Sequence, residues 1–151
     1  MPGYRTWATG DVPSAADFNN LHADPLPADV TPGQSTTSTS YVDLATAGPA
    51  VTETLVTGQK VLVIVSCRAD NTTNTATSAS NMSFAVSGAS TLAAADVNAA
   101  EITGICGAGT TTRMTVFTAT GTGSTTFTSK YRMVNTGTST FYDRRIIVLK
   151  L

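Results

Sequence analysis

The chain has 151 residues, a formal net charge of −1 and charged residues at only 13% of its positions. So weak a charge creates no broad basic field, and we expect no nucleic-acid partner. The hydrophobic content of 41% argues against disorder, and the length suits one domain with an extension. No apolar segment follows Met1, so we expect synthesis in a cytoplasm, with no secretory signal and no membrane anchor.

Residues 1–33 differ from the rest of the chain because they contain all but one of its six prolines. Each proline removes a backbone donor, which argues against sheet strands and favours an extended arm. Within this arm, Ser14 and Asp17 predict the N-terminus of one short helix. The arm is also more apolar than a solvated linker needs, so we expect it to dock onto another protein or onto its own domain. Its predicted anchors are Tyr4, Trp7, Val12, Phe18 and Leu21.

The strongest strand signal is the segment Lys60–Arg68, in which Val61 to Val65 are apolar without interruption. The run is too short to span a membrane and too rich in β-branched residues to favour a helix. We therefore expect a strand covered on both faces, with a sheet on each side of it. The apolar run Ile146–Leu149 is its expected companion.

Alternating segments separated by Gly, Asn and Thr predict the remaining strands. In Asn81–Ser87, Met82, Phe84 and Val86 share one face, as expected of a half-buried strand. The other expected strands are 40–47, 50–57, 110–120, 125–134 and 139–151, with two short strands within 91–105 and a surface loop at 70–80. Eight or nine strands spaced by about ten residues predict an all-β sandwich or jelly roll.

No catalytic pattern is found. His22 is the only histidine and lies in the proline-rich arm, so a hydrolytic triad is not available. Cys67 and Cys106 lack a C-x-x-C spacing or a histidine partner, which predicts two buried thiols and no metal. We expect neither an enzyme nor a bound cofactor.

The densest charge cluster in the body is formed by Arg144 and Arg145 beside Asp143. One interpretation is a solvated strand edge whose charges guard the hydrophobic run that follows. The other interpretation is a salt bridge between subunits.

The opening YRTWATGDVPSAADFNNL resembles the beginning of many virion proteins of tailed phages, especially actinobacterial ones. The shared pattern is W-x-x-G-D-V-x-x-A-A-D-F-N, at Trp7, Gly10, Asp11, Val12, Ala15, Ala16, Asp17, Phe18 and Asn19. The segments TSTSYVDL, MSFAVSGAS and FYDRRIIVLKL are similar to phage jelly-roll domains of the tumour-necrosis-factor-like kind. Neither resemblance includes a catalytic signature.

These resemblances imply an attachment arm at residues 1–35 and a jelly-roll head at residues 36–151. They also imply a homotrimer whose inner sheets pack around a three-fold axis, for which we expect interface positions at Tyr131, Phe141, Tyr142 and Arg144. The expected role is capsid decoration on the virion exterior, with the major capsid protein or other virion proteins as partners. The alternative is a minor tail, tail-tip or receptor-binding protein that contacts host surface glycans.

Overall fold

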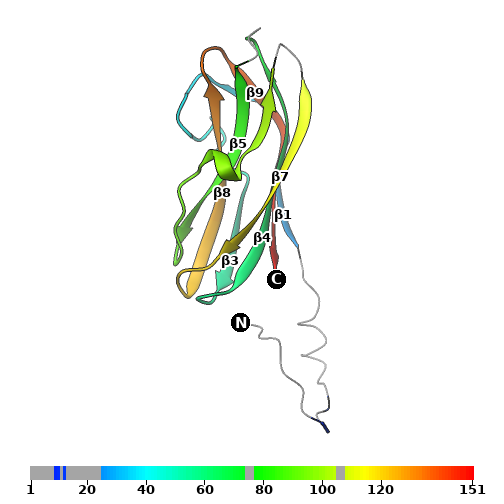
Figure 1. The fold of residues 1–151 in the computed structure, drawn as a ribbon, viewed down its shortest axis with the longest axis vertical. Helices are drawn as coiled ribbons and strands as arrows, with labels where there is room; N and C mark the ends of the chain where they lie inside the picture. The colour runs from blue at the N-terminus through cyan, green and yellow to red at the C-terminus, as the bar shows by residue number, and fades with distance from the viewer. Residues whose placement is uncertain (1–8, 11, 13–24, 74–76, 105–107) are drawn as a thin grey trace.

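The computed structural model describes residues 9–10, 12, 25–73, 77–104 and 108–151. This part of the chain is an antiparallel β-sandwich of jelly-roll type with one short 3-10 helix, which confirms the expected fold class (Figure 1). The helix expected near Ser14 lies outside the described residues. The elements are β1 (Leu26–Val30), β2 (Gln34–Thr36), β3 (Ala50–Leu55), β4 (Lys60–Asn71), β5 (Ala79–Gly88), η1 (Asp96–Asn98), β6 (Ala100–Thr103), β7 (Gly109–Thr118), β8 (Gly123–Val134) and β9 (Ser139–Lys150).

The strands form two sheets that pack face to face. The first sheet has the order β1-β9-β4-β7, and β2 also pairs with β9. The second sheet has the order β3-β8-β5-β6. From β3 to β9 the chain repeatedly crosses from one sheet to the other, so strands far apart in sequence become neighbours.

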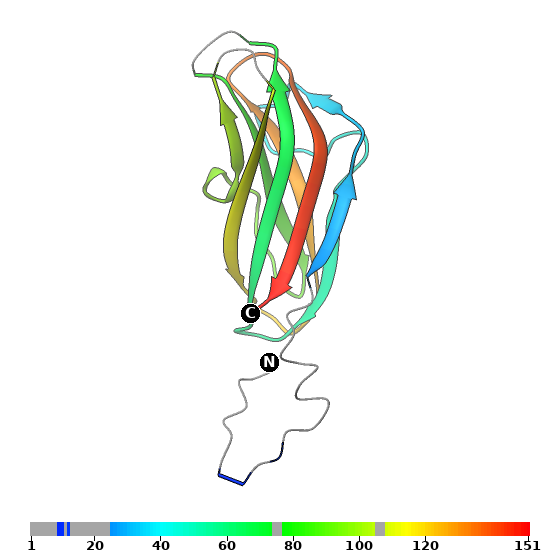
Figure 2. The ribbon, with the colours of Figure 1, turned by 90° about the vertical axis from the view of Figure 1, so that its right-hand side faces the viewer.

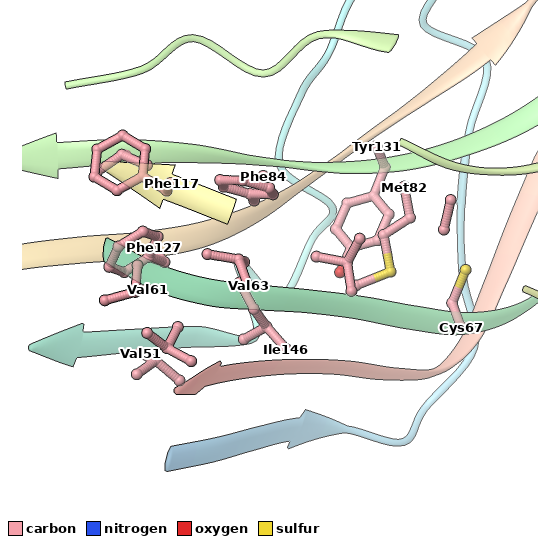
Figure 3. Close-up of a cluster of buried hydrophobic side chains, with 14 of the residues drawn as sticks. Val51, Val61, Val63, Cys67, Met82, Phe84, Phe117, Phe127, Tyr131 and Ile146 are labelled. Carbon is pink, nitrogen blue, oxygen red and sulfur yellow. The ribbon is translucent and has the colours of Figure 1, made fainter. Parts of the chain in front are cut away.

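The core lies between the two sheets and follows the predicted alternation. Val61, Val63 and Val65 of β4 are at most 1% exposed. From β8, Phe127 packs edge-on against Phe117 at 5.5 Å between ring centroids. Figure 3 shows Val61, Val63, Phe117 and Phe127 between the sheets. Burying each large apolar side chain contributes about 1.5–3 kcal/mol, so this layer is the main source of stability.

Two segments expected as strands are mostly irregular. The 40–47 segment forms only a single bridge, in which the Val42 N–H donates to the Tyr131 carbonyl at 2.9 Å. The 91–105 segment forms one bridge between Leu92 and Val86, then η1 and β6.

The expectation that prolines exclude strands from residues 1–33 is wrong for β1. Pro27 lies inside β1, opposite Ile147 of β9. Because β1 is at the edge of the first sheet, its outward side needs no donor, and a proline is tolerated there. The head therefore extends back at least to Leu26, into the segment predicted to be the arm.

Candidate functional site

The outer face of the first sheet, which points away from the second sheet, carries a row of apolar side chains across four of its five strands. Pro27 of β1 pairs with Ile147 of β9, Ile147 pairs with Ile64 of β4, and Ile64 pairs with Met114 of β7. Residues paired in an antiparallel register lie on the same face, so these four form one row. Figure 2 views the sheet from this side, with β9 in red between β1 and β4.

A second apolar row lies directly beside the first, toward the C-terminus of the chain. Leu149 pairs with Leu62, and Leu62 pairs with Val116. At the β7 edge, Met114 is 63% exposed and Val116 is 55% exposed. We call the two rows together the apolar face; its members are Pro27, Leu62, Ile64, Met114, Val116, Ile147 and Leu149.

The apolar face follows from the unbroken apolar run of β4. In a strand, successive side chains point to opposite sides, so Val61, Val63 and Val65 enter the core while Leu62 and Ile64 point outward. The prediction that this strand is covered on both faces is therefore wrong for the described residues of a single subunit, because only one sheet covers it. An apolar surface that is left partly exposed in this way is typical of interaction sites, so this face is the candidate site of the head.

A polar row borders the apolar face. Arg145 donates from Nε and Nη2 to the two carboxylate oxygens of Asp29, the second at 3.2 Å. In the same row, the Thr112 hydroxyl donates to the Ser66 hydroxyl at 3.0 Å. A shallow hollow opens here, lined by Asp29, Val30, Thr31, Ser66, Asp143 and Arg145. The predicted intersubunit role of Arg145 is therefore replaced by an ion pair within the subunit.

Three of the four predicted trimer-interface residues are wrong, because they are buried inside the subunit. Tyr131, Phe141 and Arg144 are each 0% exposed. The register of β9 against β4 shifts between Ser66 and Arg68, so Phe141 and Arg144, an odd and an even position, both point inward. Only the fourth residue, Tyr142, lies on the outer face, with the Arg68 guanidinium 4.9 Å from its ring centroid.

Arg144 is a buried cation held by backbone and amide oxygens. Its Nη1 donates to the Thr46 carbonyl at 3.3 Å, and its Nη2 donates to Gln34 Oε1 at 3.2 Å and to the Pro32 carbonyl at 3.4 Å. Its guanidinium carbon also lies 5.4 Å from the ring centroid of Tyr131. Both sequence interpretations of Arg144 are therefore wrong: it fastens β2 and the loop before β3 to β9.

The remaining predicted site residues lie mostly outside the described part of the chain. Of the five arm anchors only Val12 is described, and it is 83% exposed; Tyr4, Trp7, Phe18 and Leu21 are outside.

The prediction of a buried thiol is confirmed for Cys67, whereas Cys106 is not among the described residues. Within residues 25–73, 77–104 and 108–151, no group of three or more His, Cys, Asp or Glu side chains could hold a metal ion. In the same segments, no helix has the length and apolar character needed to cross a membrane.

Comparison with known proteins supports the fold. No protein-family model and no curated protein matches the sequence. The Eiger tumour necrosis factor from S. frugiperda is similar in structure, with a TM-score of 0.52 at 8% identity over 84% of this chain and 92% of that one. This likeness agrees with the jelly-roll topology and, at such low identity, concerns the fold alone.

Two other solved structures share less of the fold. Dimeric latent PorU from Porphyromonas gingivalis matches with a TM-score of 0.35 at 13% identity, over 85% of this chain and 13% of that one. A protein of the Gx strain of infectious bursal disease virus matches with a TM-score of 0.34 at 8% identity, over 85% of this chain and 38% of that one.

Proposed function

We propose that this chain is a non-enzymatic structural protein of a tailed-phage virion, in which a trimeric jelly-roll head attaches through the N-terminal arm. The observation that carries this proposal is the apolar face on the outer side of the first sheet. The resemblance of residues 4–21 to the openings of phage virion proteins supports the virion location. Capsid decoration is the preferred role, on the exterior of the particle and in contact with the major capsid protein.

The trimer follows from the need to cover the apolar face. Leu62 and Ile64 belong to an apolar run whose inward half is already buried, so a neighbouring copy supplies the missing cover. A closed ring hides such a face on every copy at once, whereas a monomer exposes it to water. The partner on this surface is therefore a second copy of the same chain.

The two ends of the head differ, and one of them suits attachment through the N-terminal arm. Leu26, where β1 begins, pairs with Val148 near the end of β9, so the start of β1 and the C-terminus lie at the same end of the head (Figure 2). In a ring whose axis follows the strands, three arms leave together at that end. The loop between β8 and β9 lies at the opposite end.

A receptor-binding or minor tail protein is the second candidate, and the loops at the end opposite the arm favour it. The Thr73 hydroxyl donates to the Thr136 carbonyl at 2.6 Å, and the Asn135 amide donates to the Thr77 carbonyl at 2.5 Å. These uncharged loops are tied together and carry hydroxyl and amide groups suited to hydrogen-bonding a host surface glycan.

Two measurements test these proposals. Size-exclusion chromatography with light scattering should give the mass of three chains at micromolar concentration; a monomer would overturn the trimer. Quantifying this chain against the major capsid protein in purified particles should give hundreds of copies for a decoration protein. A handful of trimers, together with binding of the purified head to host cells, would instead support the tail or receptor-binding role.

A further inference from the structure

The hollow beside the apolar face has an excess of negative charge. It contains the carboxylates of Asp29 and Asp143 and the guanidinium of Arg145. Arg145 forms a two-point ion pair with Asp29. Within the described residues, the Asp143 carboxylate has no hydrogen bond and no ion pair, and Asp143 is exposed. The hollow therefore offers one carboxylate to a cation from outside the subunit.

The opposite edge of the first sheet carries an exposed cation that is complementary to this carboxylate. Arg113 of β7 is exposed and donates from Nη2 to the Val97 carbonyl at 2.9 Å, and no carboxylate pairs with it in the described chain. A guanidinium has five N–H donors, so most of its donors stay available for a second partner. Its neighbours Val97 and Met114 are 69% and 63% exposed. This edge is thus an apolar surface with a single guanidinium.

The hollow and Arg113 lie at the same height along the strands. Ser66, in the wall of the hollow, pairs with Thr112, and Arg113 pairs with Val65, one residue pair further along. Because Val65 points into the core, the Arg113 side chain leaves the β7 edge on the side of the second sheet, next to Val97, and meets the hollow of another copy only where this edge packs onto the outer face of that copy. Rotation about an axis parallel to the strands leaves height unchanged, so a ring brings residues of equal height together. Contacts in such a ring are heterologous, joining the β7 edge of one copy to the outer face of the next.

Two other exposed cations without a carboxylate partner in the described chain fit the hollow less well. Lys60 lies opposite Thr118 at the arm end of the head, several residue pairs away from the hollow. Arg68 is stacked against Tyr142 on the same face of its own subunit. Arg113 is therefore the cation that a neighbouring copy would present to Asp143.

We propose that, in the trimer, Arg113 of each copy enters the hollow of the next copy and forms an ion pair with Asp143. The apolar face supplies the cohesion, and this charge pair fixes the height and order in which the copies meet. The inference rests on the proposed trimer and adds the residue that the partner copy contributes. It also assigns Asp143, rather than Arg144 or Arg145, as the charged group that acts between subunits.

A double-mutant cycle tests the pair in the full-length chain. Asp143 has a φ of 48°, a conformation that Asn tolerates, so Asp143→Asn removes the charge with little backbone strain. Arg113→Gln, Asp143→Asn and the double variant are compared by sedimentation at decreasing concentration. Each single variant should weaken trimer association by about tenfold, and the double variant should be no weaker than either single one. If the double variant instead weakens trimer association by the product of the two single-variant losses, the two residues act independently and the proposed ion pair is wrong.

Disulfide trapping gives an independent readout. In a Cys106→Ser background, Arg113→Cys combined with Asp143→Cys should form covalent dimers and trimers on oxidation. The control combines Lys60→Cys with Asp143→Cys and should remain largely monomeric on a denaturing gel. A wild-type chain that is monomeric would overturn the trimer itself. A trimer without trapping at positions 113 and 143 would overturn only the proposed contact.

Discussion

Val63 and Ile64 are consecutive residues of β4 with opposite surroundings: Val63 is 0% exposed between the two sheets, whereas Ile64 lies half-exposed on the apolar face. The same substitution should therefore have different effects at the two positions. Val63→Asp places an unpaired carboxylate in the core and should cost several kcal/mol, about 3–5, leaving little soluble protein. Ile64→Asp should leave a folded head that no longer forms trimers.

Circular dichroism and light scattering on both variants check this prediction. The expected result is a β-type spectrum with monomer mass for Ile64→Asp, and loss of soluble protein for Val63→Asp. Ile64→Val is the matched control, because it keeps the face apolar and should keep the trimer. A folded trimer carrying Ile64→Asp would contradict the assignment of this face as the interface.

Arg144 and Arg145 are adjacent in β9 but differ in their expected contributions to stability. Arg144→Met should lower the free energy of unfolding by about 2–4 kcal/mol, because it removes a buried guanidinium that donates to the carbonyls of Pro32 and Thr46 and to the buried Gly48 carbonyl. Arg145→Met breaks only an exposed ion pair with Asp29 and should lower the free energy of unfolding far less, because water screens an exposed pair. Urea unfolding of the two variants measures the difference. Equal losses would show that the Arg144 contacts contribute no more than a surface pair.

Gly88 and Gly58 both have positive φ angles, of 99° and 83°, but only Gly88 is crowded. A Cβ atom on Gly88 would lie 2.3 Å from the Ser124 carbonyl oxygen, whereas nothing lies within 4 Å of a Cβ on Gly58. Gly58→Ala should cost about 1 kcal/mol from the left-handed backbone alone. Gly88→Ala should cost clearly more, since backbone must also move. Thermal unfolding of both variants would refute this if their melting temperatures fell equally.

The sequence alone was sufficient to predict the strands in which every second residue is apolar. Met82, Phe84 and Val86 alternate with polar residues, and the structure buries all three. The strand is not half-buried as predicted, however, because Asn81 and Ser83 on its other face are also 0% exposed. Phe127 and Met133 of β8 follow the same rule. Side chains alternate between the two faces of any strand, so this pattern can be recognised without knowing which strands lie beside it.

The predictions that were wrong concern features that depend on parts of the chain far away in sequence. Pro27 lies in a strand because β9 offers it an edge, which the proline pattern alone does not reveal. Arg144 points inward because β9 shifts its register against β4, and its partners Pro32 and Thr46 are far away in sequence. The apolar run of β4 did signal two covered faces, but it does not say whether the second cover comes from the same chain.

Alkaline pH should destabilise the head through buried weak acids. Burial raises the pKa of the Cys67 thiol from its ordinary value of 9.0 to about 12, and burial also raises the pKa of the Tyr131 hydroxyl. Because the folded pKa values are the higher ones, this contribution to stability is complete below pH 9. It is lost as the pH rises toward the folded values. Melting temperatures should therefore be steady at neutral pH and fall between pH 9 and 12.

The buried thiol should also be chemically silent in the folded state. In a Cys106→Ser background, only Cys67 remains, and a thiolate-specific reagent at pH 8 should label it only after denaturant is added. Rapid labelling of the native protein would contradict the burial of Cys67.

Two truncations separate attachment from folding. Removal of residues 1–24 leaves β1 and β2 in place, so the head should stay folded and trimeric but no longer join the virion. Removal of residues 1–36 also takes away the Asp29 partner of Arg145 and the Gln34 contact of buried Arg144, and it exposes the edge of β9. That variant should be markedly less stable and prone to aggregate through the open edge. Urea unfolding and incorporation into particles lacking the wild-type chain distinguish the two outcomes. Virion incorporation of the chain without residues 1–24 would show that attachment uses the head rather than the arm.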